Sequence, residues 1–158
     1  MDIDKLLEEA RGFLDLKMWQ EAQEVVDRLP DAAQSLPQVL GLRVSICWEG
    51  KQFELMAKAA QEMVDLNPER STAWLNLASA KRHAFGMHAG KTVLEEATLK
   101  CPADADVLFS LACYESEMGE AQKAKAFLDA SITLNPDLKM HALEASELSA
   151  MWAALSKG

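Results

Sequence analysis

Residues 71–102, STAWLNLASAKRHAFGMHAGKTVLEEATLKCP, are the key to this chain because residues 105–136, ADVLFSLACYESEMGEAQKAKAFLDASITLNP, repeat their pattern. The prolines that close successive runs, Pro68, Pro102 and Pro136, stand 34 residues apart twice in succession. The offsets inside the two units agree as well: Trp74 with Leu108, Leu77 with Leu111, Ala78 with Ala112, Gly90 with Ala124, and Leu94 with Leu128. A fixed period of this length predicts a solenoid, in which each repeat packs against its neighbours.

Each unit predicts two antiparallel helices. Trp74, Leu77 and Ala78 lie at i, i+3 and i+4, so they share one face of a helix. The small residues Gly90 and Ala124 stand on the following helix of each unit, where they allow two helices to approach closely. We expect these positions to form the contacts between the paired helices.

Glycine and proline mark the helix ends. Gly86 and Gly119 lie between the paired helices, where a residue with positive φ ends one helix and turns the chain. Pro68 and Pro136 follow asparagine and stop the second helix, because proline lacks a donor and restricts the residue before it.

These residues resemble the tetratricopeptide repeat, whose 34-residue pattern runs Trp-x2-Leu-Gly-x2-Tyr, then Ala, an aromatic residue and Pro. The chain departs from that pattern at the tyrosine position, which holds Lys81 and Glu115, although Tyr114 is adjacent. The resemblance implies an all-α fold, a right-handed α-solenoid of about four antiparallel helix pairs with a C-terminal capping helix.

We expect a single domain over residues 1–158. It divides into a divergent first helix pair (1–35), three repeats (36–70, 71–104 and 105–138) and a C-terminal cap (139–158). Gly50 stands 18 residues before Pro68, whereas Gly119 stands 17 before Pro136, which predicts one extra residue and a local bulge in the 36–70 unit. The cap resembles the closing segment of some bacterial repeat arrays, and whether its helix breaks at Ser146 stays open.

The composition narrows the class of protein. A chain of 158 residues with 49% apolar content is long enough for one domain with a substantial core. The net charge of −9 argues against a nucleic-acid partner, because such proteins carry a clustered excess of lysine and arginine. The first residues, MDIDKLLEEARGF, do not resemble a secretory leader, and no apolar run approaches the roughly 20 residues of a membrane span. Reduced, mostly buried Cys47, Cys101 and Cys113 fit the cytoplasmic location that we expect.

No catalytic constellation stands out, so we predict a protein that is not an enzyme and has no cofactor or metal site. His83 and His88 are five residues apart, which is wrong for two metal ligands on one helical face. The sequence has no phosphate-binding loop, no GxGxxG, no GxSxG and no HExxH. Its many carboxylates stand among lysines on solvated helix faces.

The resemblance implies a binding surface instead, since the first helix of each repeat lines a concave groove in similar proteins. The matching positions lie one, five, and eight or nine residues after the tryptophan position. They are Leu40, Val44, Cys47 and Trp48 in the 36–70 unit; Leu75, Ser79, Arg82 and His83 in the next; Phe109, Cys113, Ser116 and Glu117 in the third; and Leu143 and Glu147 in the cap. We expect a largely apolar groove that binds a peptide or helix of a partner protein.

One specialised form of the family grips a C-terminal carboxylate with Lys, Asn and Arg. The matching positions here hold Leu40, Val44, Asn76, Asp106 and Ser110, so only the asparagine is present. We therefore expect no binding of acidic chaperone tails.

Two other functions stay open from the sequence. The chain is also compatible with a small acidic export or secretion chaperone that shields an apolar partner segment. Alternatively it is a structural module that forms homodimers or larger assemblies through Trp19, Trp152 or the groove. The interpretation that competes with an open binding groove is that the largely apolar groove is partly covered by the protein's own termini or by a second copy.

Overall fold

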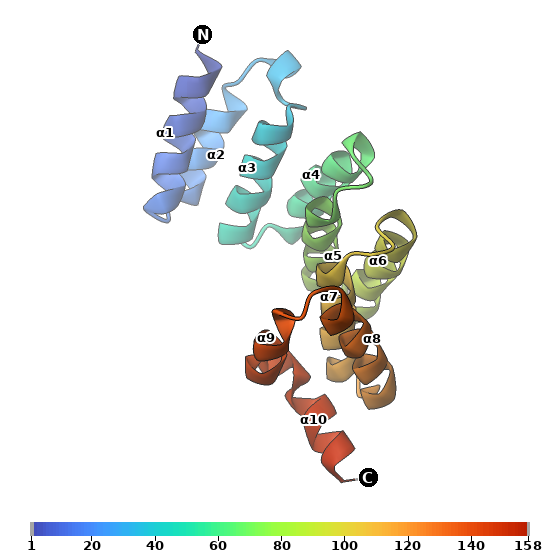
Figure 1. Cartoon of the computed structure of the whole chain (residues 1–158). Helices are drawn as coiled ribbons and strands as arrows, with labels where there is room; N and C mark the ends of the chain where they lie inside the picture. The colour runs from blue at the N-terminus through green and yellow to red at the C-terminus, as the bar shows by residue number, and fades with distance from the viewer. Residues whose placement is uncertain (1, 158) are drawn as a thin grey trace.

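The fold is an all-α solenoid. A computed structural model describes residues 2–157, in which no strand occurs. The helices, with two short 3₁₀ turns, follow one another in antiparallel pairs along an extended stack (Figure 1). Their bounds are α1 (Ile3–Asp15), α2 (Trp19–Asp27), η1 (Asp31–Ala33), α3 (Pro37–Glu49), α4 (Phe53–Leu66), α5 (Ser71–Phe85), α6 (Met87–Lys100), α7 (Ala105–Glu117), α8 (Ala121–Leu134), α9 (Leu138–Glu144), η2 (Ser146–Leu148) and α10 (Ser149–Ser156).

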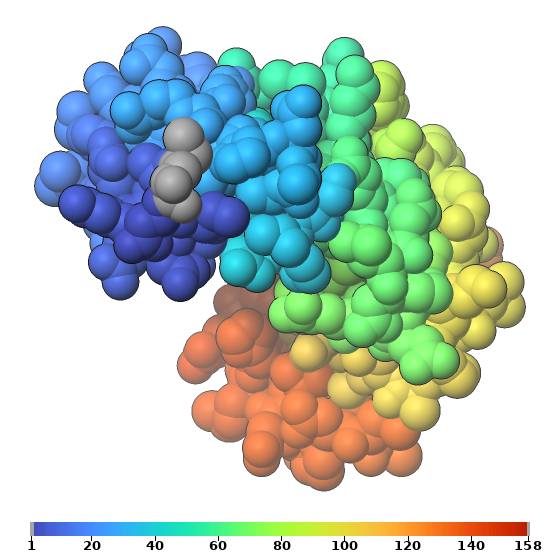
Figure 2. All heavy atoms as spheres, turned by 90° about the horizontal axis from the view of Figure 1, so that it is seen from above, coloured from blue at the N-terminus to red at the C-terminus, as the bar shows by residue number. Residues whose placement is uncertain are grey.

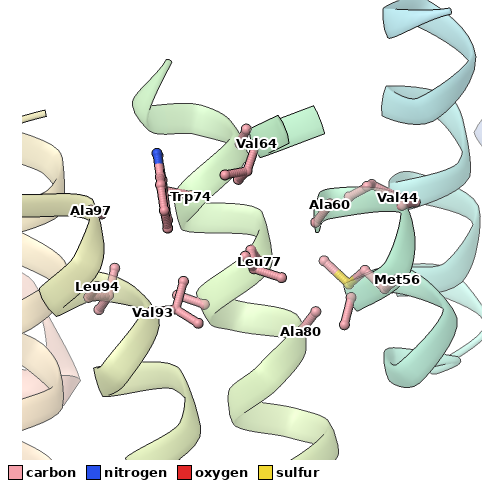
Figure 3. Packing of buried hydrophobic residues seen from close by; sticks show 14 of the residues in the cluster. Val44, Met56, Ala60, Val64, Trp74, Leu77, Ala80, Val93, Leu94 and Ala97 are labelled. Atoms are coloured by element: carbon pink, nitrogen blue, oxygen red, sulfur yellow. The ribbon is translucent and has the colours of Figure 1, made fainter. Parts of the chain in front are cut away.

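The core consists of apolar side chains that join each helix to the next. Around α5, Trp74 and Leu77 point between Val64 of α4 on one side and Val93 and Leu94 of α6 on the other (Figure 3). Trp74 is 5% exposed, and its indole N–H donates to the Pro68 carbonyl at 2.7 Å. The predicted core face of this repeat is therefore confirmed, and Trp74 also ties the helix to the connector before it.

Three of the turns within helix pairs have the same geometry. Lys17, Lys51 and Gly119 each have positive φ, at 62°, 55° and 83°. In each turn the next residue donates a backbone hydrogen bond five residues back, as Gln52 does to Cys47 at 2.8 Å and Glu120 to Glu115 at 2.8 Å. This is the Schellman ending of a helix, which favours glycine at the left-handed residue. The turn between α5 and α6 is shorter, with Gly86 alone at φ 103°.

The prediction of a bulge in the 36–70 unit, which was based on the spacing from Gly50 to Pro68, is wrong. Gly50 has an ordinary φ of −83°, and the left-handed residue is Lys51. Lys51 stands 17 residues before Pro68, as Gly119 stands 17 before Pro136, so the two units are in register. Accordingly α4, α6 and α8 all have 14 residues. Lysine occupies the turn position in the 36–70 unit, where the 105–138 unit has glycine. Taking Gly50 as the turn residue therefore gave a spacing that was one residue too long.

Replacing Lys51 by glycine is expected to stabilise the protein by about 0.5–1 kcal/mol, because glycine adopts positive φ without the steric cost of a Cβ atom. Lys51 is exposed and forms no ion pair within the described chain, so nothing else is lost. The matched control is Lys58→Gly in the middle of α4, which should destabilise by about 1 kcal/mol. Urea unfolding followed by circular dichroism measures both, and a destabilised Lys51→Gly variant would contradict the assigned turn.

The contact between the two clearest repeats uses Tyr114 and Glu115 in place of the repeat's usual tyrosine. A Cβ atom on Gly90 would lie 2.8 Å from the Tyr114 ring and 2.9 Å from the Ala78 carbonyl oxygen, so only glycine fits there. Beside it Glu115, 1% exposed, pairs with Lys91 of α6 at 2.7 Å. This hydrogen bond raises the pKa of Lys91.

The C-terminal segment closes the stack. The chain breaks at Ala145, which is extended at ψ 118°, and continues through η2 into α10. Helix α10 packs against α7 and α8, with Leu148 and Met151 fully buried. The Met151 N–H donates to the Ser116 hydroxyl at 3.1 Å, which fixes α10 on α7.

The stack is curved. Seen from above, it runs in an arc from the blue N-terminal helices through green α4 and α5 to the orange C-terminal part, and the hollow side lies between the blue and orange ends (Figure 2). Side chains of α1, α3, α5, α7 and α9 line the hollows described below.

Candidate functional site

Helix α3 presents a different face to the concave side from the one that the sequence predicted. Leu40, Val44 and Cys47 are buried in the core, at 2%, 5% and 7% exposed. The residues one position later, Gly41 and Ser45, line the hollow surface instead. Leu40 and Cys47 therefore line none of the three hollows described below. Val44 still reaches the floor of a hollow, and Trp48 lines it as predicted.

The first hollow lies between α1, α3 and α5 and has a volume of about 650 Å³. Its wall contains Trp48, which is 45% exposed, and Ser79 of α5. At one end Lys17 and Glu49 form an ion pair at 2.8 Å. The complete lining is Leu14, Asp15, Lys17, Val44, Ser45, Trp48, Glu49, Met56, Asn76 and Ser79. The hollow therefore combines apolar and polar groups.

An aromatic cluster of Trp48, Phe53 and His83 adjoins this hollow through Trp48, the one ring of the three that lines it. The His83 ring stacks on Phe53 at 4.6 Å between centroids, and it meets the Trp48 ring edge-on at 5.2 Å. Its Nδ1–H donates to the Ser79 carbonyl at 2.8 Å, which leaves Nε2 free on an exposed ring. Aromatic side chains offer large contact area at low entropic cost, as in the centres of many protein interfaces.

A second hollow of about 670 Å³ adjoins the first and shares Leu14, Asp15 and Ser45 with it. Arg11 of α1 and Arg70, the residue before α5, line this second hollow, and both are exposed. Neither arginine forms an ion pair with any residue among 2–157. The rest of the lining is Pro37, Gln38, Gly41, Leu42 and Met63.

A third hollow, of about 480 Å³, lies between α5, α7 and the cap. Its wall includes Phe109, whose ring meets that of His141 at 5.9 Å, and also Ser110, Glu144, Ala145 and Glu147. Glu144 and Glu147 have no basic partner within the described residues. The break at Ala145 brings these two carboxylates to the same wall, so this end of the concave side is acidic.

Arg82 also lines the third hollow, but its charge is already neutralised. It pairs with Glu117, and its guanidinium lies 4.9 Å from the centre of the Tyr114 ring. Burial, the largest single influence, lowers the pKa of Arg82, but the hydrogen bonds and charges of Glu117 and Tyr114 together outweigh it and raise that pKa. Burial together with Glu147 and Glu117 raises the pKa of Cys113 to about 12, so its thiol is no nucleophile near neutral pH.

Three other residues that were predicted to line the groove do not line any of the three hollows. Leu75 is half-buried and packs against the core, outside the three hollows. Ser116 is 1% exposed and lies under α10. Leu143 is 63% exposed and is not part of the lining of the third hollow, whereas His141 and Glu144 are.

Several lining residues were missed by the sequence reasoning. Arg11 and Leu14 lie on α1, whose repeat pattern is too weak to place them on the concave side. Their i, i+3 spacing was the available signal, because it puts them on one helical face. Nothing in the sequence linked Arg11 to Arg70, which is 59 positions away.

Two further observations concern metal ions and membranes. Among residues 2–157 no group of three or more His, Cys, Asp or Glu side chains is arranged to hold a metal ion. None of the described helices combines the length and apolar character needed to cross a membrane.

Comparisons with known proteins identify the fold. No protein-family model and no curated protein matches the chain. Among solved structures, the crystal structure of MamA protein is similar with a TM-score of 0.74 at 15% identity, covering 97% of this chain and 82% of the other. A second structure, titled MamA MSR-1 C2, is similar with a TM-score of 0.68 at 14% identity, covering 87% and 79%. TTC0263, a thermophilic TPR protein of Thermus thermophilus, has a TM-score of 0.65 at 16% identity, covering 98% and 88%. The chain thus has the fold of tetratricopeptide-type helical repeats.

Proposed function

We propose that this chain, folded as a tetratricopeptide-type solenoid, is a non-catalytic scaffold that binds a segment of another protein on its concave side. The observation that carries the proposal is the series of hollows along one curved face, formed by α1, α3, α5, α7 and α9. A peptide or helix bound in such a series buries side chains at several points while the scaffold remains unchanged. This arrangement supports a role in binding a partner protein better than a role in catalysis.

The lining supports a partner segment of mixed character rather than a purely apolar one. Trp48 and Phe109 supply exposed or half-exposed aromatic surface in two separate hollows. Between them lie polar groups such as Ser79 and the paired Arg82. The shift of register in α3 exchanges the expected leucine and valine for Gly41 and Ser45, which makes the groove less apolar than the sequence predicted.

The experiment is capture of partner proteins from lysate on immobilised protein, comparing wild type with Trp48→Glu and Phe109→Glu. Because both rings lie in the hollows, we expect either change to reduce the amount of captured partner by about 10-fold, as for aromatic residues at interface centres. The matched control is Leu99→Glu on α6, where an 81% exposed leucine lies outside the hollows. Equal capture by all four proteins would refute recognition through the concave side.

Light-scattering mass after size exclusion separates this function from self-association. A monomer from low to high micromolar concentration is expected, since Trp19 and Trp152 are half-buried against the protein's own core. A mass that rises with concentration and falls back in Phe109→Glu would instead make a second copy the occupant of the groove.

A further inference from the structure

We propose that the second hollow is an acceptor for a carboxylate, and that the partner segment carries an aspartate or glutamate side chain next to apolar residues. The site consists of Arg11 and Arg70 above a floor of Leu14, Leu42 and Met63. The inference rests on the proposed function, because it identifies the chemistry of the partner that binds the concave side.

The two arginines come from distant parts of the chain and converge on one hollow. Arg11 lies on α1, and Arg70 is the N-cap residue of α5. Neither has a carboxylate partner among residues 2–157, whereas Arg28, Arg43 and Arg82 do. Guanidinium groups bind carboxylates through two parallel hydrogen bonds, so two free guanidiniums at one hollow provide strong donors for an anion.

The helix ends add to this positive potential. Pro37 and Gln38 at the start of α3 and Arg70 at the start of α5 line the same hollow. Neither helix has a side-chain cap or an acidic residue in its first turn. By contrast α7 is capped by Asp104 and carries Asp106 in its first turn. The N-termini of two helices without compensating acids therefore border the hollow that holds the arginines.

The charge of the hollow matches a single carboxylate. Asp15, one turn beyond Arg11 on α1, also lines it, so the side chains carry two positive charges and one negative charge. This excess of one positive charge stands out in a chain of net charge −9. The apolar floor requires an aliphatic neighbour for the acid, as on one face of an amphipathic segment.

This site differs from the family clamp for C-terminal carboxylates that was considered from the sequence. The clamp positions lack cations in either register, because Gly41 and Ser45 replace Leu40 and Val44 at the first two. The carboxylate acceptor uses α1 and the connector before α5, and it binds an acidic side chain inside a segment rather than a chain end.

The test is selection from a random 16-residue peptide library displayed on phage, with the full-length protein as bait. Each peptide is joined to the coat protein through its C-terminus, so enriched acids act through their side chains. We expect the selected peptides to share an aspartate or glutamate at a fixed spacing from leucine or an aromatic residue. Selection on the Arg11→Gln/Arg70→Gln variant should lose the acid, and selection on the matched control Arg28→Gln should retain it.

Titration calorimetry with one selected peptide then measures the contribution of the carboxylate. Changing its acid to glutamine should weaken Kd about 10- to 100-fold on the wild type and less than about 3-fold on Arg11→Gln/Arg70→Gln. Circular dichroism of the variant checks that it is folded, as expected for two exposed arginines.

Each other result overturns the inference in a distinguishable way. Apolar peptides without an enriched acid would refute the carboxylate acceptor and leave the proposed scaffold function intact. Enriched lysine or arginine would show that the acidic third hollow selects the partner. If no peptide is selected at all, the protein does not bind linear segments, and the proposed scaffold function is refuted as well.

Discussion

Replacing Trp74 by alanine is expected to lower the free energy of unfolding by about 3–5 kcal/mol, as for other buried tryptophans. The indole is 5% exposed and fills the space between α4 and α6, so its removal leaves a cavity that the helices cannot close. Its N–H also donates to the Pro68 carbonyl, which is then left with only the weak thiol donor of Cys101 at 3.7 Å. For a domain of this size such a change is a large part of the total stability.

Urea unfolding followed by far-ultraviolet circular dichroism measures this effect. Trp74→Phe helps to separate the two contributions, because it keeps an aromatic ring in the core and removes the donor together with part of the indole surface. We expect the lost hydrogen bond to cost about 1–2 kcal/mol in addition to the cost of the smaller ring. Trp48→Ala is the matched control, since Trp48 is 45% exposed and its removal should cost less than about 1 kcal/mol. A similar loss for Trp48→Ala and Trp74→Ala would contradict the assigned core.

Replacing Lys91 by methionine is expected to destabilise the protein by about 3 kcal/mol, because it removes the partner of the buried Glu115 carboxylate, while Lys91 itself is 22% exposed. Lys91 pairs at 2.7 Å with Glu115, which is 1% exposed and whose Oε2 has no hydrogen-bond partner among the described residues. Without the ammonium group, a carboxylate at the interface of α6 and α7 is left without compensation.

The double variant Lys91→Met/Glu115→Met tests this explanation. Methionine has a similar length to both side chains, and replacing a whole buried pair by apolar residues is often neutral or stabilising. We expect the double variant to recover most of the stability lost by Lys91→Met. The control Lys125→Met breaks an exposed pair with Asp129 on α8 and should change stability by less than about 0.5 kcal/mol. If the double variant is as unstable as the single one, packing rather than charge explains the effect.

Much of the fold was predictable because local rules and the period of the repeat agree. The 34-residue spacing of the prolines, the helical spacing of Trp74, Leu77 and Ala78, and the small residue at position 90 each follow from the order of residues in the sequence. These features depend on helix geometry and on contacts between neighbouring helices, which the order of residues already specifies.

The groove was less predictable because a shift of one residue rotates a helix by about 100°. Taking Gly50 as the turn residue moved the expected surface of α3 from Gly41 and Ser45 to Leu40 and Val44. A lysine at positive φ carries no sequence signal that distinguishes it from an exposed lysine in a helix. The backbone of the turn revealed the register, and with it the polar character of the groove.

The sequence by itself therefore determined that this protein is a stack of helix pairs with a small-residue contact at Gly90 and a tryptophan-centred core. The tertiary structure alone decided which side chains line the same hollow on the concave side: Arg11 and Arg70 in one, and Glu144, Glu147 and Phe109 in another. The physical reason is that a repeat pattern encodes contacts between adjacent elements, whereas the curvature of the stack and the break at Ala145 bring together residues between which no periodic relation exists.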